Sequence, residues 1–197
     1  MCNVKNVWYP LCSPVETKVN SAGDWKLSPS SFMTICLEWS LQVDVFASEW
    51  NRQLPKYVSW SPQPNCWKVD AFSFPCKDFG AFCFPPFNMI PFCLSKLIEE
   101  EAEAVLITPY WRSQPWFPVA LDIAVAAPRL LRPCPDLLTS PTGDPLVAND
   151  SIWLIAWRFR RRLSKNGVSD VASSLILSAT RRNTNAAYQS AWNSGGD

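Results

Sequence analysis

From about residue 24 onward, apolar residues follow first a helical spacing and then short continuous runs, which predicts helices and strands in turn. Ser28-Pro29-Ser30-Ser31 is a good helix start, and apolar residues then recur on one face as far as Trp39. Residues 90–103 predict an amphipathic helix with Lys96 on its exposed side. Residues 119–127 predict a third helix.

Apolar and β-branched runs between these helices predict strands. The runs cover residues 41–47, 57–60, 67–72, 79–84, 104–109 and 152–157. We expect parallel strands near Val43–Phe46, Lys68–Ala71 and Ala104–Ile107 in one sheet, because apolar runs alternate with an amphipathic helix. The predicted fold class is therefore α/β, a Rossmann-like three-layer unit with a mostly parallel sheet, followed by an irregular proline-rich linker and C-terminal helices.

Prolines and glycines divide the chain into four parts. Residues 1–23 show no sustained period and are expected to form an unstructured tail, whereas residues 24–127 form the α/β unit. Residues 128–168 are predicted to be a proline-rich and basic linker that contains one short strand. Residues 169–197 predict two short helices that cannot bury much surface alone.

Composition narrows the chemistry. The chain has 197 residues, enough for one sizeable core, and contains no His. Without His the commonest general base and metal ligand are missing, which disfavours Ser-His and Cys-His hydrolases and zinc sites. The 8 cysteines show no C-x-x-C spacing and follow no secretory leader, so we expect free thiols inside a cell. No apolar run approaches the ~20 residues of a membrane helix, so we expect neither a metal nor a membrane partner.

A rigid aromatic loop, Phe84-Pro85-Pro86-Phe87, follows one predicted strand. Its two prolines fix φ near about −65° and supply no N–H, so the chain must leave the sheet there. Ligands of α/β sheets bind beyond the carboxyl ends of the strands, where this loop would present two rings and free carbonyls. A second aromatic loop over residues 109–118 would face the same crevice. The alternative is a turn whose aromatic rings belong to the core.

Two acids stand near the ends of predicted strands. Asp44 lies inside the run over residues 41–47, and Asp70 lies near the end of the run over residues 67–72. A carboxylate in this position can hold a ligand's hydroxyls or amine, although Asp44 could instead cap the turn that follows it. We expect both acids and Pro85–Phe87 to lie along one edge of the sheet.

Net charge is +1, and concentrated positive charge occurs only in the C-terminal fifth of the chain. The basic residues there are Arg158, Arg160, Arg161, Arg162, Lys165, Arg181 and Arg182. If the chain binds DNA, we expect weak contact with the backbone at these residues, without sequence preference. The alternative is an ordinary solvated face.

With these motifs identified, residues 24–192 resemble a segment of the polyprotein of DIRS-type retrotransposons, the tyrosine-recombinase elements. That segment is in turn similar to phage-type DNA adenine N6-methyltransferases. The resemblance is carried by five motifs: Val43–Ser48, Tyr57–Trp60, Val69–Phe72, Phe84–Phe87 and Trp111–Phe117. Residues 169–192 resemble the start of the SAM-like (sterile-alpha-motif-like) N-terminal domain of tyrosine recombinases and integrases, which clamps DNA through its backbone.

The resemblance implies that Asp44 and Asp70 flank a pocket for S-adenosylmethionine and that Phe84–Phe87 replaces the loop that holds a flipped adenine. Phe84 stands where the family has a carboxamide or carboxylate that accepts a hydrogen of the adenine amine. A phenyl ring cannot accept it in that way, so the resemblance implies little or no methyl transfer.

We therefore expect a non-catalytic fragment of a retrotransposon polyprotein, linked to DNA binding and to DNA recombination or integration. Its expected partners are DNA and other polyprotein domains, and its expected place is inside the cell, in the nucleus rather than the cytoplasm. Two alternatives stay open. One is an active DNA adenine N6-methyltransferase that uses S-adenosylmethionine, and the other is a protein-interaction module whose aromatic loops form the contact surface.

Overall fold

The structure is a computed structural model that describes residues 25–145 and 152–160. The predicted tail over residues 1–23 and the predicted helices over residues 169–197 lie outside these ranges. So do five of the basic residues that we expect to contact DNA: Arg161, Arg162, Lys165, Arg181 and Arg182.

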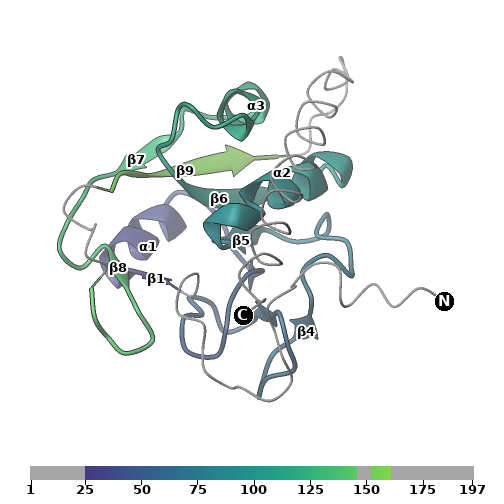
Figure 1. Cartoon of the computed structure of the whole chain (residues 1–197). Coiled ribbons are helices and arrows are strands. Elements are labelled where there is room, and N and C mark those ends of the chain that lie inside the picture. The colour runs from purple at the N-terminus through teal and green to yellow at the C-terminus, as the bar shows by residue number, and fades with distance from the viewer. Residues whose placement is uncertain (1–24, 146–151, 161–197) are drawn as a thin grey trace, which may run out of the picture.

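A five-stranded sheet forms the centre of the described part (Figure 1). In spatial order its strands are β2 (Val43–Asp44), β5 (Ala81–Cys83), β6 (Ala104–Pro109), β9 (Leu154–Phe159) and β7 (Arg129–Leu131). β2, β5 and β6 run parallel, whereas β9 is antiparallel to both of its neighbours. The protein is thus of mixed α/β content with a mixed central sheet, which confirms the predicted class in this coarser form.

β6 is buried along its whole length, and its side chains alternate between the two faces of the sheet. Ala104 and Leu106 belong to one hydrophobic core, whereas Val105 and Ile107 belong to the other. A strand that is buried on both faces has a continuous apolar sequence, which is why the sequence predicts this strand at its full length.

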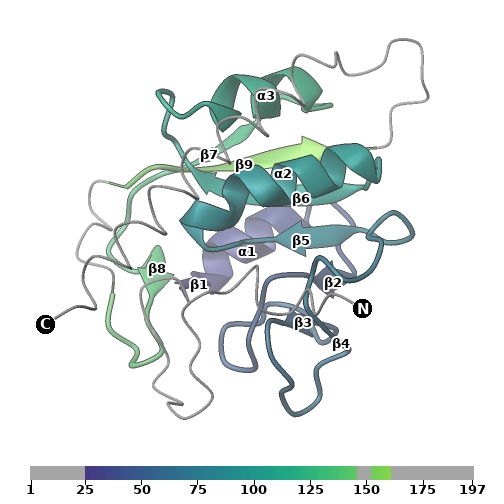
Figure 2. The same ribbon diagram turned by 45° about the vertical axis from the view of Figure 1, so that its right-hand side comes forward.

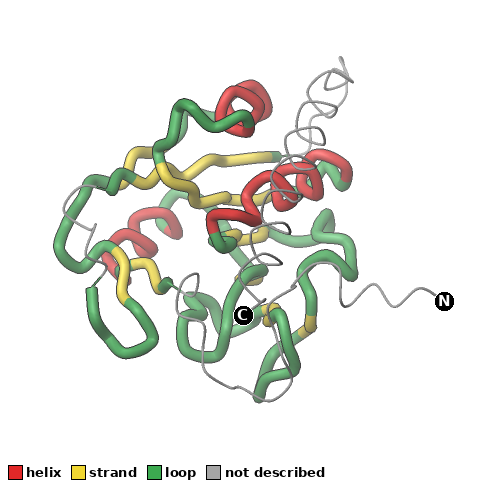
Figure 3. Tube along the Cα trace, viewed as in Figure 1, coloured by secondary structure: helices red, strands yellow, loops and turns green. Residues whose placement is uncertain are grey.

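Helices cover both faces of the sheet (Figure 2). α2 (Ile90–Glu99) and α3 (Trp116–Ile123) pack on one face, and α1 (Pro29–Cys36) packs on the other. Beside α1 lies a two-stranded antiparallel sheet that pairs β1 (Lys26–Leu27) with β8 (Leu138–Thr139). Loops make up much of the remaining described chain (Figure 3).

The predicted start of the first helix is confirmed. The Ser28 hydroxyl accepts a hydrogen bond from the Ser31 backbone N–H at 3.4 Å, and Pro29 occupies the first turn, where its missing N–H costs nothing. The helix ends at Cys36, earlier than the predicted Trp39.

The other two helices also differ from their predicted bounds. α2 stops at Glu99 instead of residue 103, because Glu101 adopts a left-handed φ of 48° that a helix cannot continue through. α3 begins at Trp116, inside the predicted aromatic loop, and ends at Ile123. The sequence therefore predicts the helices better than their ends.

The prediction that Lys68–Ala71 belongs to the central sheet is wrong. Its counterpart β4 (Lys68–Val69) pairs in parallel with β3 (Val58–Ser59) in a separate two-stranded sheet. One isolated parallel bridge, between Asp44 and Tyr57, joins this sheet to β2. β4 ends after two residues because Asp70 adopts a positive φ of 63°, which turns the chain out of the strand.

The α/β unit continues past residue 127, where the sequence places a linker. β7 and β9 complete the central sheet, and β9 spans Leu154–Phe159 rather than the predicted residues 152–157. The indole N–H of the fully buried Trp157 donates a hydrogen bond to the Thr108 hydroxyl at 2.9 Å, which ties β9 to the centre of the sheet. Phe117 of α3 packs edge-on against the same indole at 5.2 Å.

This arrangement predicts that a chain ending at Ala127 does not fold cooperatively. Such a chain lacks β9, so one side of β6 loses its hydrogen-bond partners and Phe117 loses the Trp157 ring. A chain ending at Arg160 is the control and should unfold in one transition in urea, followed by circular dichroism. A cooperative transition of equal midpoint in the shorter chain would contradict the extended unit.

Candidate functional site

The carboxyl ends of three parallel strands meet at one edge of the central sheet. Asp44 ends β2, Phe84 follows β5 and Tyr110 follows β6. β3, the next strand along the chain, lies on one side of β2 and is joined to it through the bridge between Asp44 and Tyr57. β5 lies on the other side of β2. Strand order therefore reverses between β2 and β5, which is where open α/β sheets bind their ligands. We take this edge as the candidate site.

Asp44 is almost completely buried at this point, with 2% of its surface exposed. Its carboxylate accepts a hydrogen bond from the backbone N–H of Gln53 at 2.9 Å and another from that of Phe46. Burial raises the pKa of the carboxyl to about 7, and these two backbone donors oppose that rise. The Asp44 carboxylate thus accepts hydrogen bonds from the loop that follows its strand. This role is closer to the predicted capping of a turn than to that of an acid that is free to hold a ligand.

The loop after β2 is itself fixed by two side-chain amides. The Asn51 side-chain oxygen accepts a hydrogen bond from the Ser48 backbone N–H at 2.7 Å. The Gln53 side-chain amide donates to the Leu27 carbonyl of β1 at 2.6 Å. The backbone N–H that reaches Asp44 is therefore held in place from the opposite side of the loop.

Little space remains between Asp44 and the Pro-Pro loop. The hollow that these residues line has a volume of about 10 Å³. Its walls are formed by Trp25, Leu27, Asp44, Phe46, Asn51, Gln53, Phe82 and Phe84. This is room for roughly one water molecule, whereas pockets for small ligands measure about 300–1,000 Å³.

The two aromatic loops meet beside this hollow. Phe87 lies 6.4 Å from Phe84 and packs edge-on against Trp111 of the second loop at 5.4 Å, between ring centroids. Phe84 and Phe87 nevertheless pack against different hydrophobic cores, on opposite faces of the sheet. Both rings are partly buried and pack the loop against the two cores, whereas Trp111 remains exposed.

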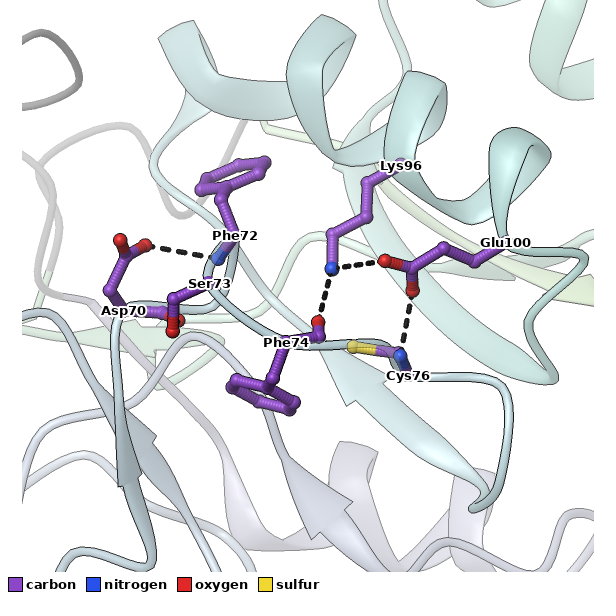
Figure 4. A network of polar contacts seen from close by, with 7 residues as sticks. All are labelled: Asp70, Phe72, Ser73, Phe74, Cys76, Lys96 and Glu100. Carbon is purple, nitrogen blue, oxygen red and sulfur yellow. Dashed lines mark hydrogen bonds and ion pairs between the residues drawn. The ribbon is translucent and has the colours of Figure 1, made fainter. Parts of the chain in front are cut away.

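Asp70 stands directly after β4, and its carboxylate accepts a hydrogen bond from the Phe72 backbone N–H at 3.0 Å (Figure 4). The Phe72 ring packs edge-on against Phe46, with 5.6 Å between centroids. The segments that follow Asp44 and Asp70 are thus in contact through these two rings. Like Asp44, Asp70 bonds the backbone of its own loop.

The sequence places Lys96 on the exposed side of its helix, and this prediction is wrong. Lys96 is only 8% exposed. Its ammonium group donates to the Phe74 carbonyl at 2.6 Å and to the Glu100 carboxylate at 2.5 Å (Figure 4). The second Glu100 oxygen accepts from the Cys76 backbone N–H at 2.7 Å. The ion pair between Lys96 of α2 and Glu100, which directly follows this helix, therefore anchors the loop that carries Asp70.

Two of the predicted DNA-binding residues lie in the described part. Arg158 in β9 is partly buried and forms an ion pair with Glu103 at 3.5 Å. Arg160 is exposed where the described chain ends. Arg158 is therefore less available for phosphate than the sequence suggests.

Two buried thiols of the hydrophobic core, Cys76 and Cys83, are unsuited to act as nucleophiles. Cys36, Cys66, Cys76, Cys83 and Cys93 are free thiols. Burial raises the pKa of Cys76 to about 12, and a hydrogen bond with Cys93, together with burial, raises the pKa of Cys83 far above its ordinary value. These sulfurs stay protonated at neutral pH and behave as small apolar side chains.

Within residues 25–145 and 152–160, no cluster of acidic or cysteine side chains is arranged to hold a metal ion. None of the helices in those ranges is both long and apolar enough to cross a membrane. Comparison of the chain with protein-family models and with curated proteins finds no match.

We expect Lys96→Met to destabilise the protein by about 2–3 kcal/mol. The substitution leaves the Glu100 carboxylate half-buried without its cation and the Phe74 carbonyl without its donor. Urea unfolding measures the loss. Lys77→Met, at a neighbouring exposed position, is the control and should change stability by no more than about 0.5 kcal/mol. Equal effects of the two substitutions would contradict the anchoring role.

Stability should also depend on pH through Asp44. Its folded pKa of about 7 exceeds its ordinary value of 3.8, so the folded state holds the proton more tightly. The contribution of Asp44 to the free energy of unfolding is largest below pH 4. It falls by roughly 3–5 kcal/mol as the pH rises to about 7. In Asp44→Asn, which keeps an acceptor for Gln53, this loss should disappear. Parallel losses between pH 5 and pH 8 in both proteins would contradict the assignment.

Proposed function

We propose that this chain is a non-catalytic α/β module of a retrotransposon polyprotein, linked to DNA binding and to DNA recombination or integration. The observation that carries the proposal is the closed crevice between β2 and β5, at the point where a sheet of this kind would bind its ligand. The motifs along residues 43–117 that resemble such polyproteins supply the context.

The strand order supports a Rossmann-like ancestry for the fold. If the bridge between Asp44 and Tyr57 is counted, the parallel strands stand in the row β4-β3-β2-β5-β6. Numbered along the chain, this row is 3-2-1-4-5, the order of doubly wound nucleotide-binding sheets. The antiparallel β9, inserted between β6 and β7, is an addition to that scheme.

The residues present do not fit S-adenosylmethionine. The two acids that the resemblance assigns to the cofactor, Asp44 and Asp70, already accept hydrogen bonds from their own loops. Phe84 lines a hollow of about 10 Å³, in which a nucleoside has no room. Opening this space would require Phe84 to leave the hydrophobic core on the α1 side.

The Pro-Pro loop is equally unsuited to hold an adenine amine. Phe84 offers no acceptor for the second amine hydrogen, and its ring is committed to packing. A preorganised acceptor can contribute about 3–4 kcal/mol to catalysis in a dry site, so its loss removes most methyl transfer. The alternative of an active adenine methyltransferase is therefore the weaker one.

A module that keeps such a fold without an open pocket can still connect the domains of a polyprotein. The exposed Arg160 stands where the chain leaves β9, toward the basic residues that follow. An exposed cation at this place supports backbone contact with DNA, whereas partnership with other polyprotein domains and a place in the nucleus rest on the resemblance alone.

Titration calorimetry with S-adenosylmethionine tests the proposal. We expect no saturable binding up to about 1 mM, the upper end of common substrate affinities, because the crevice is filled. No labelled methyl group should reach an adenine-containing oligonucleotide, whereas an active phage-type adenine methyltransferase run in parallel is the positive control. Saturable binding together with methyl transfer would sink the proposal.

A further inference from the structure

A group of cations lies over aromatic rings on the small sheet formed by β3 and β4. The ammonium groups of Lys56 and Lys68 lie 3.6 and 4.6 Å from the ring centroid of Trp67. The guanidinium carbon of Arg52 lies 5.4 Å from the ring centroid of Tyr57, which directly follows Lys56 in the sequence. We call Lys56, Trp67 and Lys68 the basic aromatic patch. It belongs neither to the crevice nor to the C-terminal basic residues.

Trp67 is both fixed and accessible. Its backbone N–H donates to the Tyr57 carbonyl at 2.8 Å, and its ring packs edge-on against Phe74 and Phe79 at 5.7 and 5.6 Å. Even so, 37% of its surface is exposed. The indole therefore stands in one orientation before any ligand binds, which lowers the entropy lost on binding.

Neither lysine of the patch forms an ion pair within the described residues. The ion pairs found there involve Lys96, Arg129 and Arg158, and none includes Lys56 or Lys68. From residue 50 to residue 69 the sequence contains three cations and no acid. The acids that flank this stretch are Glu49 and Asp70, and the Asp70 carboxylate bonds the Phe72 backbone. A cation over an indole is held weakly, so it keeps most of its capacity to bind an anion.

We propose that the basic aromatic patch binds single-stranded nucleic acid, with phosphates on Lys56 and Lys68 and a base on Trp67. On binding, the ammonium groups move from the indole to phosphate oxygens, and an unpaired base stacks on an indole face that a lysine has vacated. Flat rings combined with cations are what sequence-tolerant binding of single strands requires. A duplex keeps its bases stacked inside, and an acidic peptide has anions but no flat group for the indole.

The position of the patch separates it from Arg158, the C-terminal basic residue that lies within the described sheet. β3 and β4 lie beside β2, whereas β9, which carries Arg158, is separated from β2 by β5 and β6. Substitutions in the patch therefore leave the surroundings of Arg158 unchanged. The inference does not depend on the proposed function, because neither the closed crevice nor the Pro-Pro loop enters it.

Fluorescence anisotropy of a labelled oligothymidylate, measured with the full chain, tests the inference. The oligonucleotide should exceed the roughly 4–16 nucleotides that such sites cover. We expect Lys56→Gln combined with Lys68→Gln to weaken binding about tenfold or more and to make the salt slope shallower by about 1.4, since each contact with a single strand contributes about 0.7. The matched control, Arg112→Gln combined with Arg132→Gln, removes two exposed cations elsewhere and should leave the slope unchanged.

Trp67→Leu should weaken binding at least about fivefold with no change in the salt slope, because it removes stacking and no charge. Trp153→Leu is its control, since Trp153 is 42% exposed and immediately precedes β9. Trp67→Phe keeps a ring and should retain most of the affinity. Melting followed by circular dichroism verifies that each variant is folded.

Three results would overturn the inference. One is an unchanged affinity and slope in the double lysine variant, and another is an equal loss in the arginine control, which would mark a general effect of net charge. The third is competition by a duplex of the same length, by polyglutamate or by phosphatidylserine vesicles that equals competition by unlabelled single strand. Stronger competition by the unlabelled single strand supports the assignment.

Discussion

The pairing of β6 with β9 is the constraint on which the rest of the structure depends. β6 is buried on both faces, so its backbone groups need partners on both sides, and β5 and β9 provide them. The bond from Trp157 to Thr108 fixes the register of this pair from inside the core. Once β6 is fixed, β5 and β2 follow in parallel, and the carboxyl edge with its loops is set.

At that edge, contacts between side chains and backbone decide whether a crevice is open. Asp44 and Gln53 fasten the loop after β2, while Lys96 and Glu100 fasten the loop after β4. Both loops then carry aromatic rings inward, and Phe46 meets Phe72 between them. The closed state of the site is therefore built from several short polar contacts rather than from the aromatic rings alone.

The sequence predicts what is encoded locally and fails where partners are distant. The start of α1 and the full length of β6 follow from a cap and a continuous apolar run. The sheet to which β4 belongs cannot be predicted in this way, because the sequence of a two-residue strand does not indicate which strand pairs with it. Helical spacing predicts an exposed Lys96 because it contains no information about the distant loop whose Phe74 carbonyl accepts a hydrogen bond from this side chain. The basic aromatic patch escapes notice because β3 and β4 join its cations only in the fold, although the acid-free stretch over residues 50–69 hints at it.

Asp44 connects these observations. A buried carboxyl whose pKa rises to about 7 lowers stability at neutral pH, so packing alone gives no reason for an acid at this position. An open pocket would instead expose the same carboxylate to water or to a ligand's hydroxyl groups, where its charge has a use. Here the backbone donors of Phe46 and Gln53 take the place of such a ligand. Asp44 thus lies at the carboxyl edge of the sheet, where a ligand could reach it if the hollow were open, while its hydrogen bonds serve only its own loop.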